Sequence, residues 1–443
     1  MFMRDVIQKK RDGGSLSAAE IDFFVNGYTE GAIPDYQAAA LLMAICFSGL
    51  SADEIFLLTG AIARSGEIVD LSGVKGTKVD KHSTGGVGDK TTFVAAPLAA
   101  ACGVPVAKMS GRGLGFTGGT VDKMESIPGM RSSLGADEFI ALVNRTGIAV
   151  IGQTGRVAPA DKKIYALRDV TATVDSLGLI ASSIMGKKLA SGSDAFVLDI
   201  KCGSGAFMGT LADAMSLGET MAGIGEAAGK KVIAVVTDMD QPLGRCVGNS
   251  IEVIEAIETL KGRGPDDVTE LSLRLASYMI CAGGAAGTRD EGYGMAERAL
   301  ESGAGLGKFR EFVGGQHGDP RVTEDYSLFP EAAFSEPALS GEDGIVSGVD
   351  AALIGLASQR AGAGRETKDD AIDLSAGIVM RKKRGDAVRA GEPLAEVFGS
   401  DPARLRIAAE TARSAFAIGR DRPARTELIR AVIDGRGPGP LWP

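Results

Sequence analysis

The chain has 443 residues, 44% hydrophobic and 24% charged, which is ordinary for a soluble globular protein and excludes a mainly disordered chain. Its formal net charge of −9 does not favour nucleic acid or an anionic membrane as a partner. The 5 cysteines are widely spaced and form no C-x-x-C motif, so we expect neither disulfides nor a zinc site, and a cytoplasmic location. Residues 1–14 are charged and lack an apolar core, so we expect no signal peptide.

The N-terminal residues predict three short helices. Two capping-box patterns, each a serine followed three residues later by a glutamate, mark helix starts at Ser17 and Ser51. Two further consecutive helices are predicted much later, at 161–171 and 176–190, with no strand between them. We therefore expect one discontinuous helical domain, made of residues 1–70 and 160–191.

The intervening and following segments alternate short β-rich runs with glycine turns and helices. The candidate strands are 104–108, 148–151, 195–200 and 232–237. This alternation predicts an α/β domain with a mixed, largely parallel sheet flanked by helices, in which ligands bind at the carboxyl ends of the strands. Its expected bounds are 72–159 and 192–313.

The C-terminal third has a different texture. Residues 314–343 are irregular and rich in Gly, Pro and Asp, so we interpret them as a linker. Residues 344–399 carry short strands separated by turns. We expect residues 344–443 to form an α+β, barrel-like subdomain packed on the α/β domain.

A glycine-rich loop at residues 78–92 carries the densest set of polar side chains. Glycines let successive backbone N–H groups converge on an anion, and a helix N-terminus behind them adds its dipole. It is not a Walker A loop, because Asp89 stands where that motif needs glycine. Residues 78–125 carry six positive and four negative side chains, which indicates a local basic pocket for a phosphate-sized anion.

A second glycine-rich segment follows the first candidate strand. Residues 113–118 satisfy G-x-G-x-x-G by count, but a dinucleotide site also needs an acidic residue after the next strand. The strand 148–151 is followed by Gly-Gln-Thr instead. A dinucleotide site is therefore disfavoured.

The chain has 2 histidines, and only one of them lies among candidate functional residues. His317 lies in the predicted linker, where we expect a solvated loop residue. His82 lies inside the glycine-rich loop, where a group that titrates near neutral pH favours a functional role. Ser183 and Lys187 share one helix face, and spacing alone leaves a solvated face and a binding site equally open.

These segments together resemble the thymidine and pyrimidine-nucleoside phosphorylases. The resemblance extends from the N-terminus to about residue 398. It is carried by four runs: Lys-His-Ser-Thr-Gly-Gly-Val-Gly-Asp at 81–89, Ser-Gly-Arg-Gly-Leu-Gly at 110–115 with Thr-Gly-Gly-Thr-Val-Asp-Lys at 117–123, Ser-Ser-Ile-Met at 182–185 with Lys-Lys-Leu at 187–189, and Asp-Ala-Phe-Val-Leu-Asp-Ile-Lys at 194–201 with Gly-Ser-Gly-Ala-Phe-Met at 203–208.

The resemblance implies an enzyme that uses inorganic phosphate to cleave the N-glycosidic bond of a pyrimidine nucleoside. The products would be the free base and a (deoxy)ribose 1-phosphate, with no organic cofactor. It also implies a homodimer whose small helical and large α/β domains close a cleft during turnover. We expect the N-terminal helices to form the dimer interface, with Phe23, Phe24 and residues 41–44 partly buried in it.

The resemblance also assigns roles to individual residues. His82 corresponds to a histidine near the base O2 and the sugar, and we expect Arg168 and Lys187 to stabilise charge on the leaving base. The expected base contacts are Arg168, Ser183 and Lys187. The expected phosphate ligands are Lys81, Ser83, Thr92, Lys108, Ser110 and Thr120.

The broad-specificity branch of this family binds a potassium ion, and its ligand positions correspond here to Gly88, Leu243, Cys246 and Glu255. Two residues depart from the family pattern. Lys90 stands where some relatives have a hydroxyl, which adds a second cation at the expected ion site. Phe116 stands where many relatives have histidine, which removes a titratable group.

Three alternatives stay open. The enzyme could be restricted to thymidine rather than accepting uridine as well. A phosphoribosyltransferase of related fold shares part of the glycine loop, but it needs Mg²⁺ on a pyrophosphate and a suitable acidic cluster. A non-catalytic nucleoside-binding protein would not need all of Lys81, His82, Ser83, Arg168 and Lys187.

Overall fold

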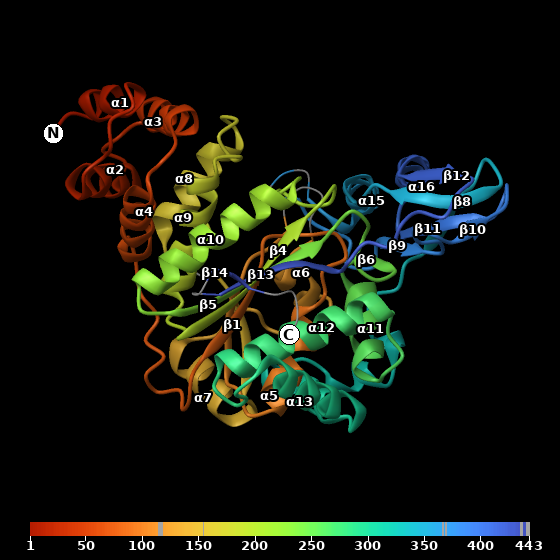
Figure 1. Cartoon of the computed structure of the whole chain (residues 1–443). Helices are drawn as coiled ribbons and strands as arrows, with labels where there is room; N and C mark the ends of the chain where they lie inside the picture. Colours follow the sequence, from red (N-terminus) through yellow and green to blue (C-terminus); the bar gives the residue numbers. More distant parts are fainter. Residues whose placement is uncertain (114–117, 154, 366, 368–369, 435–436, 440–443) are drawn as a thin grey trace.

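The computed structural model describes residues 1–113, 118–153, 155–365, 367, 370–434 and 437–439. It has three parts: helices at the N-terminus, a central seven-stranded sheet with helices around it, and two small antiparallel sheets near the C-terminus (Figure 1). The fold is therefore α/β with a separate helical part, as the sequence predicted. No helix among the described residues is long and apolar enough to cross a membrane.

The helical part contains four N-terminal helices and two from later in the chain. Ser17 and Ser51 both form the expected capping boxes. The first helix was not predicted, because it buries few apolar residues and its Lys10 is buried only through a 2.7 Å ion pair with Glu54. The later two pack against the earlier ones (Figure 1). The six helices are α1 (Met3–Arg11), α2 (Ala18–Glu30), α3 (Asp35–Ser48), α4 (Ala52–Arg64), α8 (Pro159–Asp169) and α9 (Leu177–Ala190).

The central sheet has the strand order β14-β13-β5-β4-β1-β2-β3, in which β1 to β5 are parallel and β13 and β14 are antiparallel. The four predicted strands correspond to β2–β5, but β1 was missed because its residues are mostly polar. The strands are β1 (Val79–Ser83), β2 (Val106–Ser110), β3 (Ile148–Gly152), β4 (Ala195–Cys202), β5 (Lys231–Asp238), β13 (Ile429–Asp434) and β14 (Gly437–Gly439).

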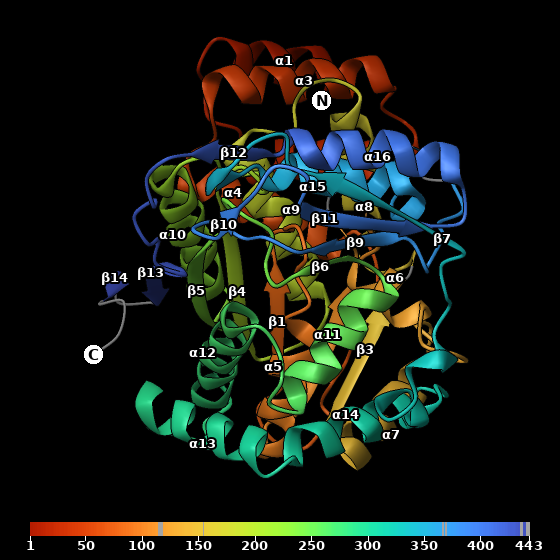
Figure 2. The same ribbon diagram turned by 90° about the vertical axis from the view of Figure 1, so that its right-hand side faces the viewer.

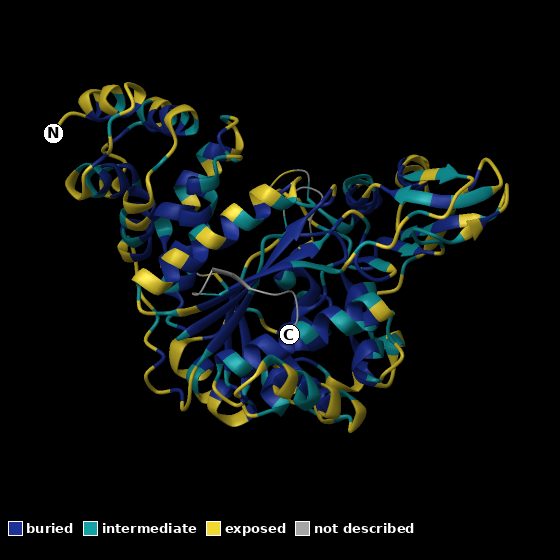
Figure 3. Cartoon of the chain, in the orientation of Figure 1, coloured by how far each residue is buried: buried dark blue, intermediate teal, exposed yellow. Residues whose placement is uncertain are grey.

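Helices cover both faces of this sheet, so its central strands are buried on both sides (Figure 3). Along β4, Val197 packs with α5 and α12 on one face, whereas Phe196 and Leu198 pack with α9 and α10 on the other. The remaining helices are α5 (Thr92–Ala101), α6 (Thr120–Glu125), α7 (Ala136–Thr146), α10 (Leu211–Ala227), α11 (Ser250–Leu260), α12 (Asp266–Ala282), α13 (Arg289–Glu301) and α14 (Ala304–Gly315).

The C-terminal part includes a strand from much earlier in the chain, because β6 pairs with β9. Figure 2 faces it, with α16 above β9 and β11. One sheet has the order β6-β9-β11-β7 and the other β10-β8-β12. Its elements are β6 (Cys246–Gly248), β7 (Phe334–Leu339), β8 (Gly344–Val349), α15 (Ala351–Ser358), β9 (Gly377–Met380), β10 (Ala387–Val388), β11 (Pro393–Gly399), α16 (Pro402–Ser414) and β12 (Phe416–Gly419), with short helical turns at Pro320–Thr323, Tyr326–Leu328 and Gln359–Ala363.

Three features differ from the sequence-based expectations. The segment interpreted as a linker contains β7, which pairs with β11. Strand β13 leaves the C-terminal part and pairs with β5 of the central sheet. Phe24, Leu41 and Leu42, expected at a dimer interface, are buried inside the helical part, while Tyr36 and Phe47 of α3 are 74% and 86% exposed.

Candidate active site

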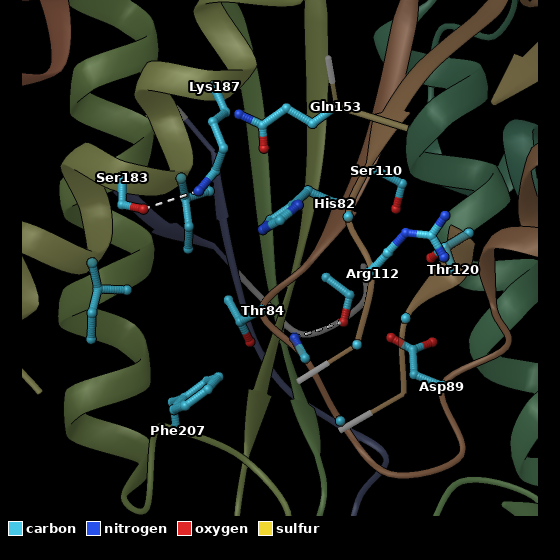
Figure 4. A pocket seen from close by; sticks show the side chains of 18 of the residues that line it. His82, Thr84, Asp89, Ser110, Arg112, Thr120, Gln153, Ser183, Lys187 and Phe207 are labelled. Carbon is cyan, nitrogen blue, oxygen red and sulfur yellow. Dashed lines mark hydrogen bonds between the residues drawn. The ribbon is translucent and has the colours of Figure 1, made fainter. Parts of the chain in front are cut away.

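A cavity of about 300 Å³ lies where the carboxyl ends of β1 and β2 face helices α8 and α9. The helical part contributes Tyr165, Arg168, Ser183 and Lys187 to its lining. The α/β part contributes His82, Ser83, Thr92, Lys108, Ser110 and Thr120. In Figure 4, His82 lies between Lys187 on one side and Ser110 on the other. The structure thus brings together nine of the ten predicted catalytic, phosphate-binding and base-binding residues.

The glycine-rich loop turns directly after β1 and leads into α5. Gly85 and Gly88 have positive φ values of 99° and 75°, which let the chain reverse there without side-chain strain. Ser83 ends β1, and Thr92 begins α5. Hydroxyl groups, backbone N–H groups and a helix N-terminus therefore converge on one wall of the cavity, which is the arrangement that binds an anion.

Lys81 is the predicted phosphate ligand that is placed elsewhere. It is fully buried, and among the described residues it does not line the cavity. Its ammonium donates to Thr91 Oγ1 at 2.6 Å and lies 3.1 Å from a carboxylate oxygen of Asp199 and 3.7 Å from one of Asp89. Lys201 contacts the same two carboxylates at 2.7 and 3.8 Å. Lys81 is thus part of a buried four-residue ion network behind the loop.

His82 faces the cavity in a strongly cationic setting. Burial lowers the pKa of His82 well below its ordinary value, and the charges of Lys188, Lys108, Lys187 and Lys81 lower it further. The imidazole is therefore neutral at pH 7 in the free protein. A neutral imidazole has one N–H, with which it can donate a hydrogen bond to a substrate oxygen.

Lys108 lies beside His82 and is also perturbed. Burial lowers the pKa of Lys108 to about 7, an effect that Asp80 opposes and Lys188 reinforces. Its ammonium donates to the backbone oxygen of Lys81. Asp80 lies 3.6 Å from Lys108 and 2.6 Å from Lys188, so one buried carboxylate serves both lysines. Sequence reasoning missed Asp80, although its position two residues before His82 places both on the same face of β1.

Ser183 and Lys187 point into the cavity from one face of α9, which decides between the two interpretations of their spacing. The Lys187 ammonium donates to Ser183 Oγ at 3.0 Å (Figure 4). It also donates to Asp161 Oδ2 at 2.5 Å. Asp161 comes from α8, so it fixes the position of Lys187 across the two helices. Gln153, which the sequence analysis did not single out, also lines the cavity.

Arg168 is held by backbone groups. Its guanidinium donates to the carbonyl oxygens of Thr173, Val174 and Leu179 at 3.1, 2.7 and 3.2 Å. Burial lowers the pKa of Arg168 from its ordinary value. The Tyr165 ring centre lies 5.8 Å from the guanidinium carbon. The arginine is therefore rigidly oriented at the cavity wall without a carboxylate bonded to it among the described contacts.

The four residues expected to hold potassium surround the side chain of Lys90. Its ammonium donates to the carbonyl oxygens of Leu243 and Cys246 at 3.0 and 2.8 Å and to Glu255 Oε2 at 2.5 Å. Gly88 packs so closely that a Cβ there would lie 2.5 Å from the Leu243 oxygen. The oxygens expected to bind the ion are thus used by a lysine, and they do not fit a potassium ion beside it. No group of three or more His, Cys, Asp or Glu among the described residues could hold a metal. Phe116 lies outside the described residues.

Comparison with known proteins agrees with this architecture. Residues 4–66 match the helical bundle domain of the glycosyl transferase family, residues 75–306 match its a/b domain, and residues 345–419 match the pyrimidine nucleoside phosphorylase C-terminal domain. Pyrimidine-nucleoside phosphorylases from Bacillus subtilis, Staphylococcus haemolyticus and Geobacillus stearothermophilus are 55%, 54% and 53% identical over 400 residues, which cover 90% of this chain and 92% of each relative.

A solved structure shares the fold at much lower identity. The anthranilate phosphoribosyltransferase of Thermus thermophilus is 20% identical, with a TM-score of 0.57 over 70% of this chain and 99% of that one. Fold and site therefore define a glycosyl transferase with a two-part cleft. Within that class, the chain belongs to the pyrimidine-nucleoside phosphorylase family.

Proposed function

We propose that this protein is a pyrimidine-nucleoside phosphorylase, which reversibly converts thymidine, uridine or deoxyuridine and inorganic phosphate into the free base and a (deoxy)ribose 1-phosphate. One observation carries the proposal: an anion-binding wall of hydroxyl and N–H groups faces the cationic Arg168 and Lys187 across a single cavity. The family membership and the names of the relatives support the same reaction.

In the proposed reaction, an oxygen of hydrogen phosphate forms a bond to C1′ of the sugar while the bond from C1′ to the base nitrogen breaks. The electron pair of that bond leaves with the base, and the proton of hydrogen phosphate ends on the base. Lys187 and Arg168 stabilise the negative charge that grows on the base in the transition state. Neutral His82 donates a hydrogen bond to the base O2, which also accumulates charge.

Each substrate would be held by a different part of the molecule. Ser83, Thr92, Lys108, Ser110 and Thr120 would bind phosphate on the α/β side, and Ser183 would bind the pyrimidine ring on the helical side. Bringing the two parts together aligns the attacking oxygen with C1′ and excludes water, which would otherwise hydrolyse the N-glycosidic bond. Lys81 would act on the phosphate through the field of its ion network rather than by direct contact.

We further propose that the protein is a cytoplasmic homodimer. Tyr36 and Phe47 expose apolar surface on α3, which supports an interface on this face of the helical part. The likeness to anthranilate phosphoribosyltransferase concerns the fold alone and supports no second activity.

The decisive experiment measures free base released from thymidine, uridine and deoxyuridine, with and without phosphate. We expect release only with phosphate, and sugar 1-phosphate in equal amount by phosphorus NMR. Lys187→Met should abolish release, while Lys162→Met on the exposed side of α8 should not, which makes it the matched control. Release without phosphate, or no release in any condition, would contradict the proposal. Release from thymidine alone would restrict it to one substrate.

A further inference from the structure

The cation-binding pocket between the glycine-rich loop and α11 is filled by the protein itself. We propose that the Lys90 ammonium permanently takes the place of a bound monovalent cation, so that this protein needs no potassium. The inference stands apart from the proposed function, because it concerns how a cation site is occupied, and its rubidium-binding and unfolding measurements need no substrate.

The geometry supports full occupation of the site. An ammonium has three N–H donors, and three oxygens of the described residues accept from Lys90, at 2.5, 2.8 and 3.0 Å. The side chain is fully buried. Gly244 lies against the same group, since a Cβ there would lie 2.9 Å from the ammonium nitrogen and 2.2 Å from Glu255 Oε2. There is thus neither a spare donor nor spare room beside the ammonium.

The charges around the site favour a permanent cation. Burial disfavours a charged ammonium, but Glu255 and Glu252 outweigh it and raise the pKa of Lys90 above its ordinary value. Glu255 also accepts backbone N–H groups of Arg245 and Cys246 at 3.0 and 3.2 Å, which fixes its carboxylate. A second cation on these oxygens would meet the ammonium as a like charge at contact distance.

The position of Lys90 explains what the cation does. It immediately follows Asp89, which lines the cavity, and precedes α5. Of its three acceptors, Leu243 lies between β5 and β6, Cys246 begins β6, and Glu255 lies on α11. The ammonium therefore fastens the glycine-rich loop to a distant segment of the chain, and a covalently attached cation does this at any salt composition.

The first test uses the unaltered protein and needs no variant. Its midpoint of thermal unfolding and its kcat/KM should be the same in potassium, sodium and choline chloride at equal ionic strength, within about 1 °C and about twofold. Equilibrium dialysis with radioactive rubidium as the probe for potassium should detect no saturable binding. A saturable rubidium site, or a midpoint that rises specifically in potassium, would overturn the proposal.

The second test reopens the site. Lys90→Thr replaces the ammonium with a hydroxyl and leaves the carbonyl and carboxylate oxygens in place. We expect this variant to lose more than tenfold of its kcat/KM in choline chloride, to recover in potassium chloride, and to bind about one rubidium per chain. The matched control is Lys10→Thr, which also breaks a buried lysine–glutamate pair, at 2.7 Å, but in the helical part.

The control should lose stability equally in every salt and bind no rubidium. If Lys90→Thr behaves identically in potassium and choline, the proposal fails, because the oxygens are then not a cation site. If Lys90→Thr is insoluble in every salt, the rubidium measurement on the unaltered protein decides alone.

Discussion

At the scale of single residues, the site depends on titratable groups whose charge is set by their neighbours. His82 and Lys108 lie in one cationic cluster, and burial lowers the pKa of both. Asp80 supplies the opposite charge from beneath, at 2.6 Å from Lys188. The two residues therefore have different roles. The neutral His82 donates a hydrogen bond, whereas the charge of Lys108 changes with pH near neutrality.

The histidine leads to a prediction on turnover. His82→Ala should lower kcat by about 10²–10⁴-fold, the usual range for general acid–base or equivalent hydrogen-bonding help, while the KM for phosphate changes little. His82→Asn keeps a donor and should retain more activity than His82→Ala. Steady-state kinetics of both variants with thymidine and phosphate measure this. Near-normal turnover of His82→Ala would leave the histidine with a packing role only.

The lysine leads to a prediction on pH. Because the pKa of Lys108 is lowered to about 7, its charged form predominates below pH 7 and is lost above it. Sulfate keeps its charge across the pH range from 6 to 9. Its binding should therefore weaken as pH rises, so that its inhibition constant against phosphate increases by up to about tenfold per pH unit above 7. Lys108→Met should remove this dependence. A sulfate inhibition constant that is flat with pH in the unaltered protein would contradict the assignment.

At the scale of elements, the helix starts show how one residue can serve two purposes. Glu54 completes the capping box of α4 with Ser51, and its Oε1 also accepts from Lys10 and from the backbone N–H of Leu16 at 2.7 and 2.8 Å. Glu20 completes the capping box of α2 on the surface, where it pairs with the half-exposed Lys9. The glutamate of the capping box therefore contributes more to the stability of the fold at α4 than at α2.

This difference predicts unequal losses of stability. Ser17→Ala and Ser51→Ala should each lower the free energy of unfolding by about 1 kcal/mol, because each removes one cap. Glu54→Gln should cost about 3 kcal/mol or more, because it leaves the buried Lys10 ammonium without its charge partner. Urea unfolding followed by circular dichroism measures all three. Equal losses for Ser51→Ala and Glu54→Gln would show that the ion pair contributes nothing.

Much of the element list could be predicted because local pattern decides it. The apolar runs of β2–β5 and the capping boxes are visible in the sequence and are confirmed by the structure. Strand β1 could not be found this way, since its Asp80, Lys81 and His82 read as a loop. The burial of Asp80 and Lys81 is tolerable only because Asp199 of β4 neutralises Lys81, while Lys108 of β2 and Lys188 of α9 neutralise Asp80, and such partners come together only in the fold.

The residues of the site also fall into those that the sequence predicts and those that only the fold places. Glycine spacing and the resemblance identified Ser83, Arg168 and Lys187, which line the cavity. The direction in which Lys81 points could not be predicted, because it depends on Asp199 of a neighbouring strand. The sequence shows that Lys90 departs from the family pattern. Only the fold shows that its ammonium reaches the oxygens of Leu243, Cys246 and Glu255.

At the scale of the whole molecule, the helical part carries apolar surface on its outer side. Phe47 and Tyr36 of α3 are exposed there, while the neighbouring Phe24 and Leu41 fill the interior of the helical part. Exposed aromatic groups on one helix favour pairing with a second copy of the chain. No residue of α3 lines the cavity between the helical and α/β parts, so pairing through the outer side of α3 would not use the residues of the site.

This surface predicts the effect of a charge on assembly. Phe47→Asp combined with Tyr36→Asp should convert a dimer into a monomer, measured by light scattering during size-exclusion chromatography at micromolar concentration. Ile407→Asp is the matched control, since Ile407 is an exposed apolar residue on α16, in the C-terminal part. If the unaltered protein is already a monomer, the proposed dimer is wrong. If the dimer persists with both charges introduced, the interface lies elsewhere on the molecule.

The antiparallel pairing of β13 with β5 has a consequence for how the protein is made. On a ribosome, residues 231–238 emerge long before residues 429–434, so the outer edge of β5 stays without its neighbour while about 190 further residues are synthesised. A bare strand edge is a template for pairing with other chains. Nascent chains that are truncated before β13 would therefore carry an open sheet edge, and synthesis of β13 is what closes it.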